Sequence, residues 1–270
     1  MKKVIIMALC LALCLTMFAG CGSTETEATV APSSTTSTTE PETFVFTMGL
    51  DDTFTPMGFR DDSNNIVGFD IDVATAVCDY LGWELVLQPI AWESKELELN
   101  AGTIDCIWNG MSWSEERAAA MTLSMPYMNN EMVFVVRSGE VSSVSDLYGK
   151  TVGVQSGSTA DETLSSSDYA SEISILSYDT NDIALFDLDF NGIDAVFMDS
   201  VSAGYYIATS GKDLEMLTEG SANEQYVIGF RKDDTELCAQ IETALYALEA
   251  DGTLETISIK WFSEDVIIFE

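Results

Sequence analysis

The sequence predicts an α/β protein of two units, each a mainly parallel β-sheet flanked by helices. Three observations carry this prediction. Strand-like and helix-like segments alternate from Phe44 onward with short connections, which is the order of βαβ units. The same order starts again after residues 130–137. The chain length then fits two units of roughly 90 to 130 residues better than one large sheet.

The first unit is expected to hold three strands and two helices. Residues 69–82 form the clearest helix, because apolar side chains recur on one face at Ile71, Ala74, Val77, Cys78 and Leu81. A second, short helix over residues 94–102 ends at Gly102, a residue type that commonly terminates helices. The apolar segments between them predict strands at 44–50, 83–90 and 103–109.

The second unit repeats this alternation and is followed by a helical tail. Strands are expected at 151–155, 173–178 and 194–199, and helices at 144–149, 160–165, 181–192 and 200–211. After a further strand at 224–231, residues 235–262 indicate two helices that are broken at Asp251 and Gly252.

The composition excludes some classes of partner and of chemistry. The 270 residues include 45 acidic and 11 basic side chains and no histidine, a formal net charge of -34 at pH 7. Such a surface repels the phosphates of nucleic acids and anionic lipids, so we do not expect nucleic-acid binding. Because 47% of the residues are hydrophobic, the acidity indicates a charged coat on a folded core. The lack of histidine removes Ser-His and Cys-His nucleophile pairs.

The first twenty residues have the features of an export signal. Lys2 and Lys3 precede an apolar run that ends at Phe18, and this run is shorter than the roughly 20 residues that a membrane-spanning helix needs. We therefore expect residues 1–20 to be removed. The residues "MFAGC" resemble a bacterial lipobox with Cys21 as the lipidated residue. Residues 21–43 are rich in Ser and Thr and predict a disordered tether.

Three cysteines lie in the body of the chain, at Cys78, Cys106 and Cys238. Their odd number, wide spacing and apolar neighbours predict buried thiols, although one disulfide stays open because sequence cannot pair them. The absence of a Cys-x-x-Cys or histidine-containing pattern disfavours a zinc site. Nothing in the sequence calls for a cofactor.

Several polar residues stand where a strand passes into a helix, at the usual ligand-binding edge of a parallel sheet. At one junction, Ser114 is placed as the N-cap of an alanine-rich helix and Arg117 follows in the first turn. A cation there opposes the helix dipole. Arg117 therefore either forms a surface salt bridge with Glu115 and Glu116 or receives an anion.

A second junction follows residues 151–155, where the chain turns at Gly157 and offers Ser158 and Thr159 as hydroxyl caps. Free amides at a helix start bind anions. The GK[ST] sequence of a phosphate loop is missing, so a small carboxylate fits better than a phosphate. A plain helix cap is the alternative.

Further candidates follow other strands. Asp199 ends one of them and is either a ligand-binding carboxylate or a helix N-cap. Asp51, Asp52 and Phe54 follow the first strand, and Trp92 follows another. Aromatic side chains at strand ends are typical of pockets, with core packing as the alternative for each ring.

These elements in this order resemble the extracellular solute-binding proteins of bacterial ABC importers, in the family for polar amino acids. The matching stretches span nearly all of residues 46–262 and are "GLDDTFTPMGFRDDSNNIVGFDIDVA", "LNAGTIDCIWNGMSWSEER", "SMPY", "DLYGKTVGVQSGSTA", "GIDAVFMDS" and "DGTLETISIKWF". The resemblance implies a two-lobed, periplasmic-binding-protein-like fold. One lobe would be residues 44–130 with 224–270, the other 131–223, and two strands near 127–131 and 223–226 would form the hinge.

The resemblance also implies a role for each site residue. Arg117 would bind the ligand α-carboxylate, aided by backbone amides near Ser112 and at Ser158 or Thr159. Asp199, the Gly110 carbonyl and the Ser112 hydroxyl would hold the α-ammonium. Two aromatic rings would sandwich the ligand side chain and four further residues would select it; these six are Phe54, Trp92, Asp51, Asn109, Gln155 and Met198.

The implied function is capture of a polar L-amino acid between closing lobes and its delivery to the permease and ATPase of an importer. The protein would act as a monomer without covalent chemistry, lipid-anchored on the outer face of the cell membrane or periplasmic. Basic amino acids are favoured because Asp51 and Trp92 suit a cation, and glutamine is next because Gln155 and Asn109 suit an amide. An extracellular sensor, or a dehydratase using Asp51 or Asp52 as acid or base, are the alternatives.

Overall fold

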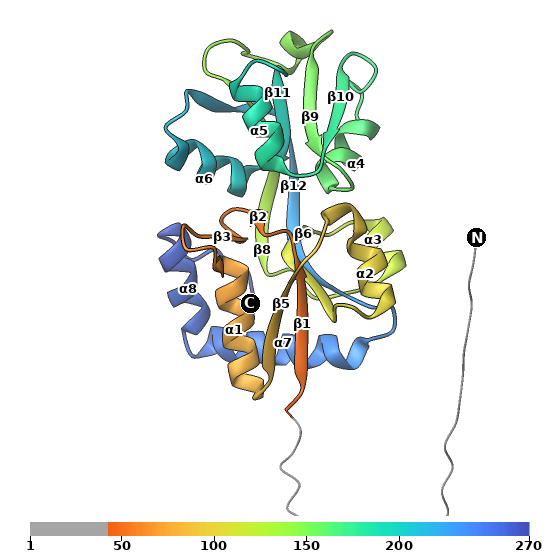
Figure 1. The fold of residues 1–270 in the computed structure, drawn as a ribbon, viewed down its shortest axis with the longest axis vertical. Coiled ribbons are helices and arrows are strands. Elements are labelled where there is room, and N and C mark those ends of the chain that lie inside the picture. The colour runs from red at the N-terminus through yellow and green to blue at the C-terminus, as the bar shows by residue number, and fades with distance from the viewer. Residues whose placement is uncertain (1–42, 270) are drawn as a thin grey trace, which may run out of the picture. The chain divides into compact units, whose positions relative to one another are not determined.

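The computed structural model describes residues 43–269 (Figure 1). The predicted export signal, Cys21 and the tether to residue 42 lie outside the described residues. In the described part, no helix has both the length and the apolar character that a membrane crossing requires.

A nine-stranded mixed sheet runs through the molecule, in the order β10-β9-β11-β8-β12-β6-β1-β5, with β7 paired to β12. The pairs among β1, β5 and β6 are parallel, as are those among β9, β10 and β11, whereas β8 and β12 are antiparallel to their neighbours. The bounds are β1 Val45–Leu50, β5 Glu84–Pro89, β6 Cys106–Ser112, β7 Thr122–Leu123, β8 Met128–Arg137, β9 Thr151–Gln155, β10 Ser174–Tyr178, β11 Ala195–Asp199 and β12 Leu214–Phe230.

The helices divide the sheet into two lobes. Lobe 1 consists of β1 to β7 with α1 (Phe69–Leu81), η1 (Trp92–Ser94), α2 (Lys95–Ala101), α3 (Glu115–Ala120), α7 (Thr235–Ala250) and α8 (Thr253–Phe262). Lobe 2 consists of β9 to β11 with η2 (Val144–Leu147), α4 (Thr159–Ser166), α5 (Asn181–Asp189) and α6 (Ser200–Ser210). Each lobe is thus a mainly parallel sheet flanked by helices, as the sequence predicts, and the fold is two-lobed (Figure 1).

Two strands, β8 and β12, pass between the lobes (Figure 1). They pair with each other on both sides of a register shift between Leu217 and Ala222. On its other edge β12 pairs with β6 in lobe 1, and on its other edge β8 pairs with β11 in lobe 2. A shift of this kind bends a strand locally, and this one lies beside lobe 2, because a Cβ added at Gly220 would meet Val144 and Phe134. Between the lobes the pairing is regular, from Ala222 opposite Met132 to Tyr226 opposite Met128.

Separate hydrophobic clusters stabilise the lobes. The largest joins β1, β6, α1 and α7 in lobe 1 and contains the buried thiols of Cys78, Cys106 and Cys238, all of which are free. In lobe 2, alternate residues of β11 enter clusters on opposite faces of the sheet: Phe197 lies in one cluster and Met198 in the other. This alternation is the period-2 geometry of a strand. The three predicted buried thiols are therefore confirmed, without a disulfide among them.

The structure differs from the sequence prediction in two places. A small sheet of β2 (Thr53–Phe54), β3 (Gly58–Arg60) and β4 (Ile66–Val67) lies between β1 and α1. Strands of two or three residues are too short to produce a readable alternation. The other difference is β12, which begins at Leu214, well before the expected start at residue 224.

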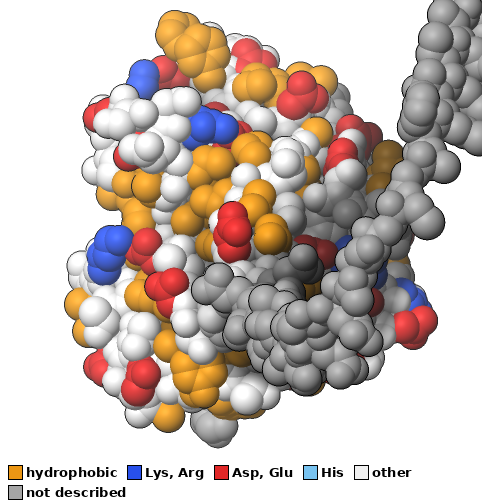
Figure 2. All heavy atoms as spheres, turned by 60° about the horizontal axis from the view of Figure 1, so that its bottom comes forward, with side chains coloured by type: hydrophobic (Ala, Val, Ile, Leu, Met, Phe, Trp, Pro, Cys, Tyr) orange, Lys and Arg blue, Asp and Glu red, His pale blue; other side chains and the backbone are white. Residues whose placement is uncertain are grey.

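On the face seen in Figure 2, acidic side chains stand at separate places among uncharged ones. This distribution agrees with a charged surface on a folded core.

Candidate functional site

A cavity with about 300 Å³ of empty space lies between the lobes. Residues at or just after the carboxyl ends of β1, β5, β6, β9 and β11 form most of its lining. All the residues predicted for the site line this cavity except Met198, and Met132 lines it in addition; the full lining is Asp51, Phe54, Trp92, Asn109, Gly110, Ser112, Arg117, Met132, Gln155, Ser158, Thr159 and Asp199.

Met198 is a correction to the sequence prediction. Its side chain is fully buried and packs with Val196, Leu185 and Ala203 in the core of lobe 2. Successive side chains of a strand point to opposite faces, so the position next to Asp199 in sequence faces away from the cavity. The role that the family resemblance implied for Met198 is therefore not realised.

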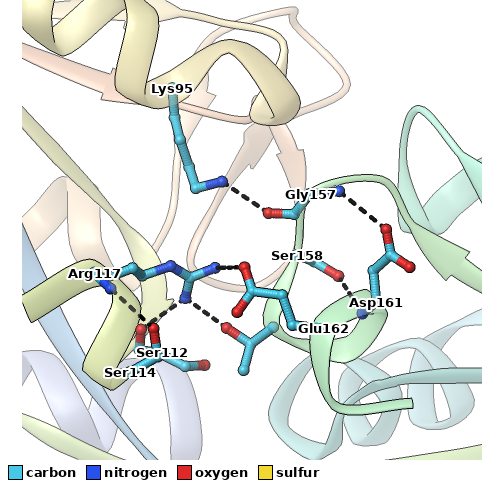
Figure 3. Close-up of polar contacts among 9 residues, drawn as sticks. Lys95, Ser112, Ser114, Arg117, Gly157, Ser158, Asp161 and Glu162 are labelled. Atoms are coloured by element: carbon cyan, nitrogen blue, oxygen red, sulfur yellow. Dashed lines mark hydrogen bonds and ion pairs between the residues drawn. The ribbon is translucent and has the colours of Figure 1, made fainter. Parts of the chain in front are cut away.

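Arg117 is buried at the first turn of α3, with 2% of its surface exposed. Ser114 caps this helix, as predicted, by accepting a hydrogen bond from the Arg117 amide. The guanidinium Nη1 donates to the Ser112 carbonyl at 2.7 Å (Figure 3). It also donates to the Thr159 hydroxyl at 2.5 Å. Its Nη2 lies 3.5 Å from a carboxylate oxygen of Glu162 in lobe 2. Arg117 therefore does not form the surface salt bridge with Glu115 and Glu116 that was the alternative.

The Nε donor of Arg117 remains available. Nε is buried and has no hydrogen-bond partner among the described residues. A buried donor without a partner costs free energy of about 1–3 kcal/mol or more for a charged group. An anion that occupied the cavity beside Arg117 would remove this cost.

The turn that precedes α4 faces Arg117 from lobe 2. Gly157 has a φ of +65°, and Ser158 caps the helix by accepting from the Asp161 amide at 3.2 Å (Figure 3). The Ser158 amide donates back to the Gln155 carbonyl, so it is used within the turn. The amide of Thr159, at the first helical position, has no partner to receive it inside the helix. Thr159 is thus the better-placed amide for an anion.

Asp199 lies at the end of β11 with 6% of its surface exposed. Its carboxylate accepts hydrogen bonds from Asn130 Nδ2 and from the Tyr226 hydroxyl, both at 2.8 Å. It makes no capping bond to α6, so the helix-cap alternative is not realised. Burial raises the pKa of Asp199 to about 6, while the hydrogen bond from Tyr226 and the charge of Arg117 oppose this rise.

Asp51 marks another end of the cavity. One of its carboxylate oxygens accepts from Gln155 Nε2 of lobe 2 at 2.7 Å, and the other accepts from the amide and hydroxyl of Thr53. The Asp51 amide donates to Asn109 Oδ1 at 3.0 Å. Asp182 lies nearby, and burial together with the charge of Asp51 raises its pKa to about 6. Two carboxyl groups therefore concentrate negative charge here.

The two aromatic residues of the site both line the cavity and pack in the core, which were the two alternatives left open by the sequence. Phe54 and Trp92 line the cavity and also belong to the hydrophobic clusters of lobe 1. Only 6% and 7% of their surfaces are exposed. Their rings are held by the core while one part of each ring faces the cavity.

Several residues of the site are absent from the sequence prediction. Asn130 and Tyr226 hold Asp199 from the crossing strands, and Glu162 pairs with Arg117 from α4. The carboxyl of Glu224, also on β12, has its pKa raised to about 7 by burial and by Asp199. Lys95 reaches across from α2 to the Gly157 carbonyl. Each of these contacts joins distant parts of the chain, and no local motif signals it.

The cavity and fold agree with comparisons to known proteins. Residues 46–264 match the family described as bacterial extracellular solute-binding proteins, family 3. The L-cystine-binding protein TcyJ of Escherichia coli is 28% identical over 222 residues, which cover 81% of this chain and 83% of that protein. The ABC transporter arginine-binding protein 1 of Escherichia coli is 31% identical over 221 residues, covering 80% of this chain and 90% of that one.

Solved structures give the same result. A substrate-binding protein of an ABC uptake transporter from Streptococcus pneumoniae, with bound histidine, aligns with a TM-score of 0.79 and 38% identity over 83% of this chain and 95% of that chain. These relatives are binding proteins and not enzymes. Since the family match covers most of the chain, this protein belongs to the bacterial extracellular solute-binding proteins of family 3.

Proposed function

We propose that the cavity binds the α-carboxylate and α-ammonium groups of a free L-amino acid. The observation that carries this proposal is a pair of buried opposite charges in one cavity, Arg117 from lobe 1 and Asp199 from lobe 2. Removing a zwitterion from water costs several kcal/mol per charge unless each charge meets an opposite partner. Arg117 and the Thr159 amide would receive the carboxylate. Asp199, with the Gly110 carbonyl and the Ser112 hydroxyl, would receive the ammonium.

The ligand side chain would extend between Phe54 and Trp92 toward Asp51. Asp51 and Asp182 favour a side chain that carries a positive charge, because two carboxyl groups share this region. Asn109 Nδ2 is buried without a partner among the described residues, and it could donate to an amide oxygen. A basic amino acid is therefore first and glutamine second. Relatives named for arginine and cystine, and one solved with histidine, are consistent with a polar ligand.

Capture would occur by closure of two lobes, one made of residues 44–130 and 224–270 and the other of residues 131–223. Four hydrogen bonds or ion pairs cross the cleft, from Asp51, Lys95 and Arg117 to lobe 2. They make the arrangement a closed one. The hinge would lie in β8 and β12, near residues 127–131 and 223–226, where the two strands pair with each other as they pass between the lobes.

The closed protein would hand its ligand, unchanged, to the permease and ATPase of an ABC importer. It would act outside the cytoplasm as a monomer. The lipobox-like sequence at Cys21 and the Ser/Thr-rich residues 22–43 support a lipid anchor with a tether. Mass spectrometry of the protein from its native membrane tests this anchor, with a diacylated N-terminal Cys21 as the expected product and an unmodified N-terminus as the contrary one.

A thermal-shift screen of all amino acids, followed by calorimetry, tests the ligand class. A ligand at about 100 times its Kd adds roughly 2.7 kcal/mol to the free energy of unfolding. We expect arginine, lysine, histidine and glutamine to raise the melting temperature most, and the decarboxylated amines of the same side chains to leave it unchanged. A preference for leucine or glutamate would contradict the assigned side-chain site. Equal binding of the decarboxylated amines would contradict the role of Arg117.

A further inference from the structure

Lys95 is a second buried cation beside the cleft. It is the first residue of α2, and 4% of its surface is exposed. Its ammonium donates to the Gly157 carbonyl of lobe 2 at 2.7 Å (Figure 3). It also lies 5.2 Å from the centre of the Trp92 ring in lobe 1. Lys95 itself does not line the cavity. Its contacts are with the walls of the site.

Burial of this ammonium is not balanced by a close ion pair. Among the described residues, no carboxylate oxygen lies within 4.0 Å of Lys95 Nζ. Burial, and then the charge of Arg117, lower the pKa of Lys95 to about 8, while Glu96, Glu162 and Glu93 act in the opposite direction. A lysine is rarely so buried without a pair. The carbonyl of Gly157 and the face of Trp92 are what hold it.

The turn of lobe 2 fits closely against the segment that contains Lys95. A Cβ added at Gly157 would lie 3.2 Å from the Cα of Glu93, and the residue has a left-handed φ of +65°. Glycine thus allows the backbone to approach lobe 1. The amide of Gly157 is 3.4 Å from the Asp161 carboxylate, so both sides of this residue are held (Figure 3).

We propose that Lys95 is a positioning residue that fastens the Gly157–Thr159 turn of lobe 2 to lobe 1 in the closed protein, and so slows the release of every ligand without contacting any of them. This inference rests on the proposed function, because the same turn presents the Thr159 amide to the ligand carboxylate. The Lys95 to Gly157 bond joins the two lobes, so it forms only when they close. A ligand that enters the open protein does not meet it.

This mechanism predicts a kinetic signature. Loss of a bond that exists only in the closed state speeds dissociation and leaves association unchanged. The factor is the same for ligands of different side chain, because Lys95 contacts none of them. Loss of a hydrogen bond to a charged group changes an equilibrium constant by a factor of roughly ten to a hundred. The Lys95→Met variant loses this bond but also avoids the cost of burying an ammonium group, and the second effect offsets part of the first. We therefore expect the dissociation rate to rise by about tenfold, the lower end of this range.

The test is stopped-flow binding of arginine and of glutamine to the full chain and to Lys95→Met. Lys150→Met serves as the matched control, because Lys150 precedes β9 in lobe 2, is 36% exposed and has its carboxylate partner, Asp194, as far as 4.0 Å away. We expect equal increases in dissociation rate for both ligands with Lys95→Met and none with the control. Gly157→Ala alters the lobe 2 side of the same contact, and we expect it to raise the dissociation rate as well.

Three results would overturn the proposal. An unchanged dissociation rate in both Lys95→Met and Gly157→Ala would show that the contact does not hold the closed protein. An effect confined to one ligand would make Lys95 a contact of the ligand side chain. A loss in the association rate alone would make it a steering charge. Failure of the unaltered chain to bind any amino acid would instead reject the proposed function, so the two failures are distinct.

Discussion

The two charges that face the cavity, Arg117 and Asp199, are both buried but are held in different ways. Two of the partners of Arg117, Thr159 and Glu162, belong to the opposite lobe. Asp199 is held by Asn130 and Tyr226, which lie on the strands that cross between the lobes. The Arg117 end is therefore completed by closure, whereas the Asp199 end is organised by the hinge itself. Binding and closure should be coupled most strongly at the carboxylate end.

Arg117→Lys is expected to have the largest effect on affinity. A lysine keeps the charge but loses the planar fork that meets a carboxylate with two hydrogen bonds. We expect at least about a hundredfold loss for every amino acid, as when one partner of a buried charge pair is removed. Calorimetry measures this loss. Arg60→Lys, at an exposed ion pair with Asp52, is the control and should bind normally. Retained affinity in Arg117→Lys would mean that another group receives the carboxylate.

The next largest effect on affinity is expected from protonation of Asp199, which makes ligand binding depend on pH. Only the ionised carboxylate attracts the ligand ammonium, and the pKa of Asp199 in the unliganded protein is about 6. As pH falls through this value, the protonated fraction grows and affinity falls, by about tenfold between pH 7 and pH 5. Calorimetry across this range should show the loss.

Asp199→Asn should bind weakly at every pH and should not show this dependence on pH. The other carboxyl groups of the site with raised pKa values, on Asp182 and Glu224, remain in this variant. A pH dependence that survives in Asp199→Asn would therefore belong to one of them and would contradict the assignment.

Glu162→Gln should move affinity in the opposite direction. Glu162 lies 3.5 Å from the Arg117 guanidinium and is 42% exposed, so it competes weakly with a ligand carboxylate. Exposed ion pairs are worth at most about 1 kcal/mol, and we expect binding to tighten by up to about fivefold. Glu116→Gln, on the helix of Arg117 itself, is the matched control and should change little. Weaker binding in Glu162→Gln would mean that Glu162 orients Arg117 instead of competing for it.

The smallest effect on affinity is expected at Asp70, a buried carboxyl that lies outside the cavity. It accepts from the Tyr127 hydroxyl and from the Gly110 amide, and burial raises its pKa to about 7. Between about pH 4 and pH 7 the folded chain holds a proton that the unfolded chain releases. Its contribution to stability is therefore present at low pH and is lost as pH rises toward 7.

Asp70→Asn should flatten this part of the pH dependence, as measured by urea unfolding at several pH values. Ligand affinity should change by only a few fold, through the Gly110 peptide. An unchanged slope of stability with pH would mean that Asp70 is ionised in the fold. A loss of affinity as large as that of Asp199→Asn would mean that buried carboxyl groups in general, rather than the one facing the cavity, support binding.

The sequence is a good guide where a signal is local. The apolar period of α1, the caps at Ser114 and Ser158, and the polar residues after β1, β6 and β9 are all set by neighbours within a few positions. Met198, which the family resemblance implied, lies instead on the opposite face of β11, in the core of lobe 2. Asn130, Tyr226, Glu162 and Lys95 act through contacts with distant segments. Only the folded arrangement reveals those.

The three thiols of the described residues all belong to one hydrophobic cluster, that of lobe 1. Burial raises the pKa of each thiol and keeps it from reagents in the folded state. A thiol-reactive dye would consequently react at the rate at which lobe 1 opens its interior. Lobe 2 would give no signal in such an assay. The unfolding of lobe 1 can therefore be followed separately from that of lobe 2 without engineering a cysteine.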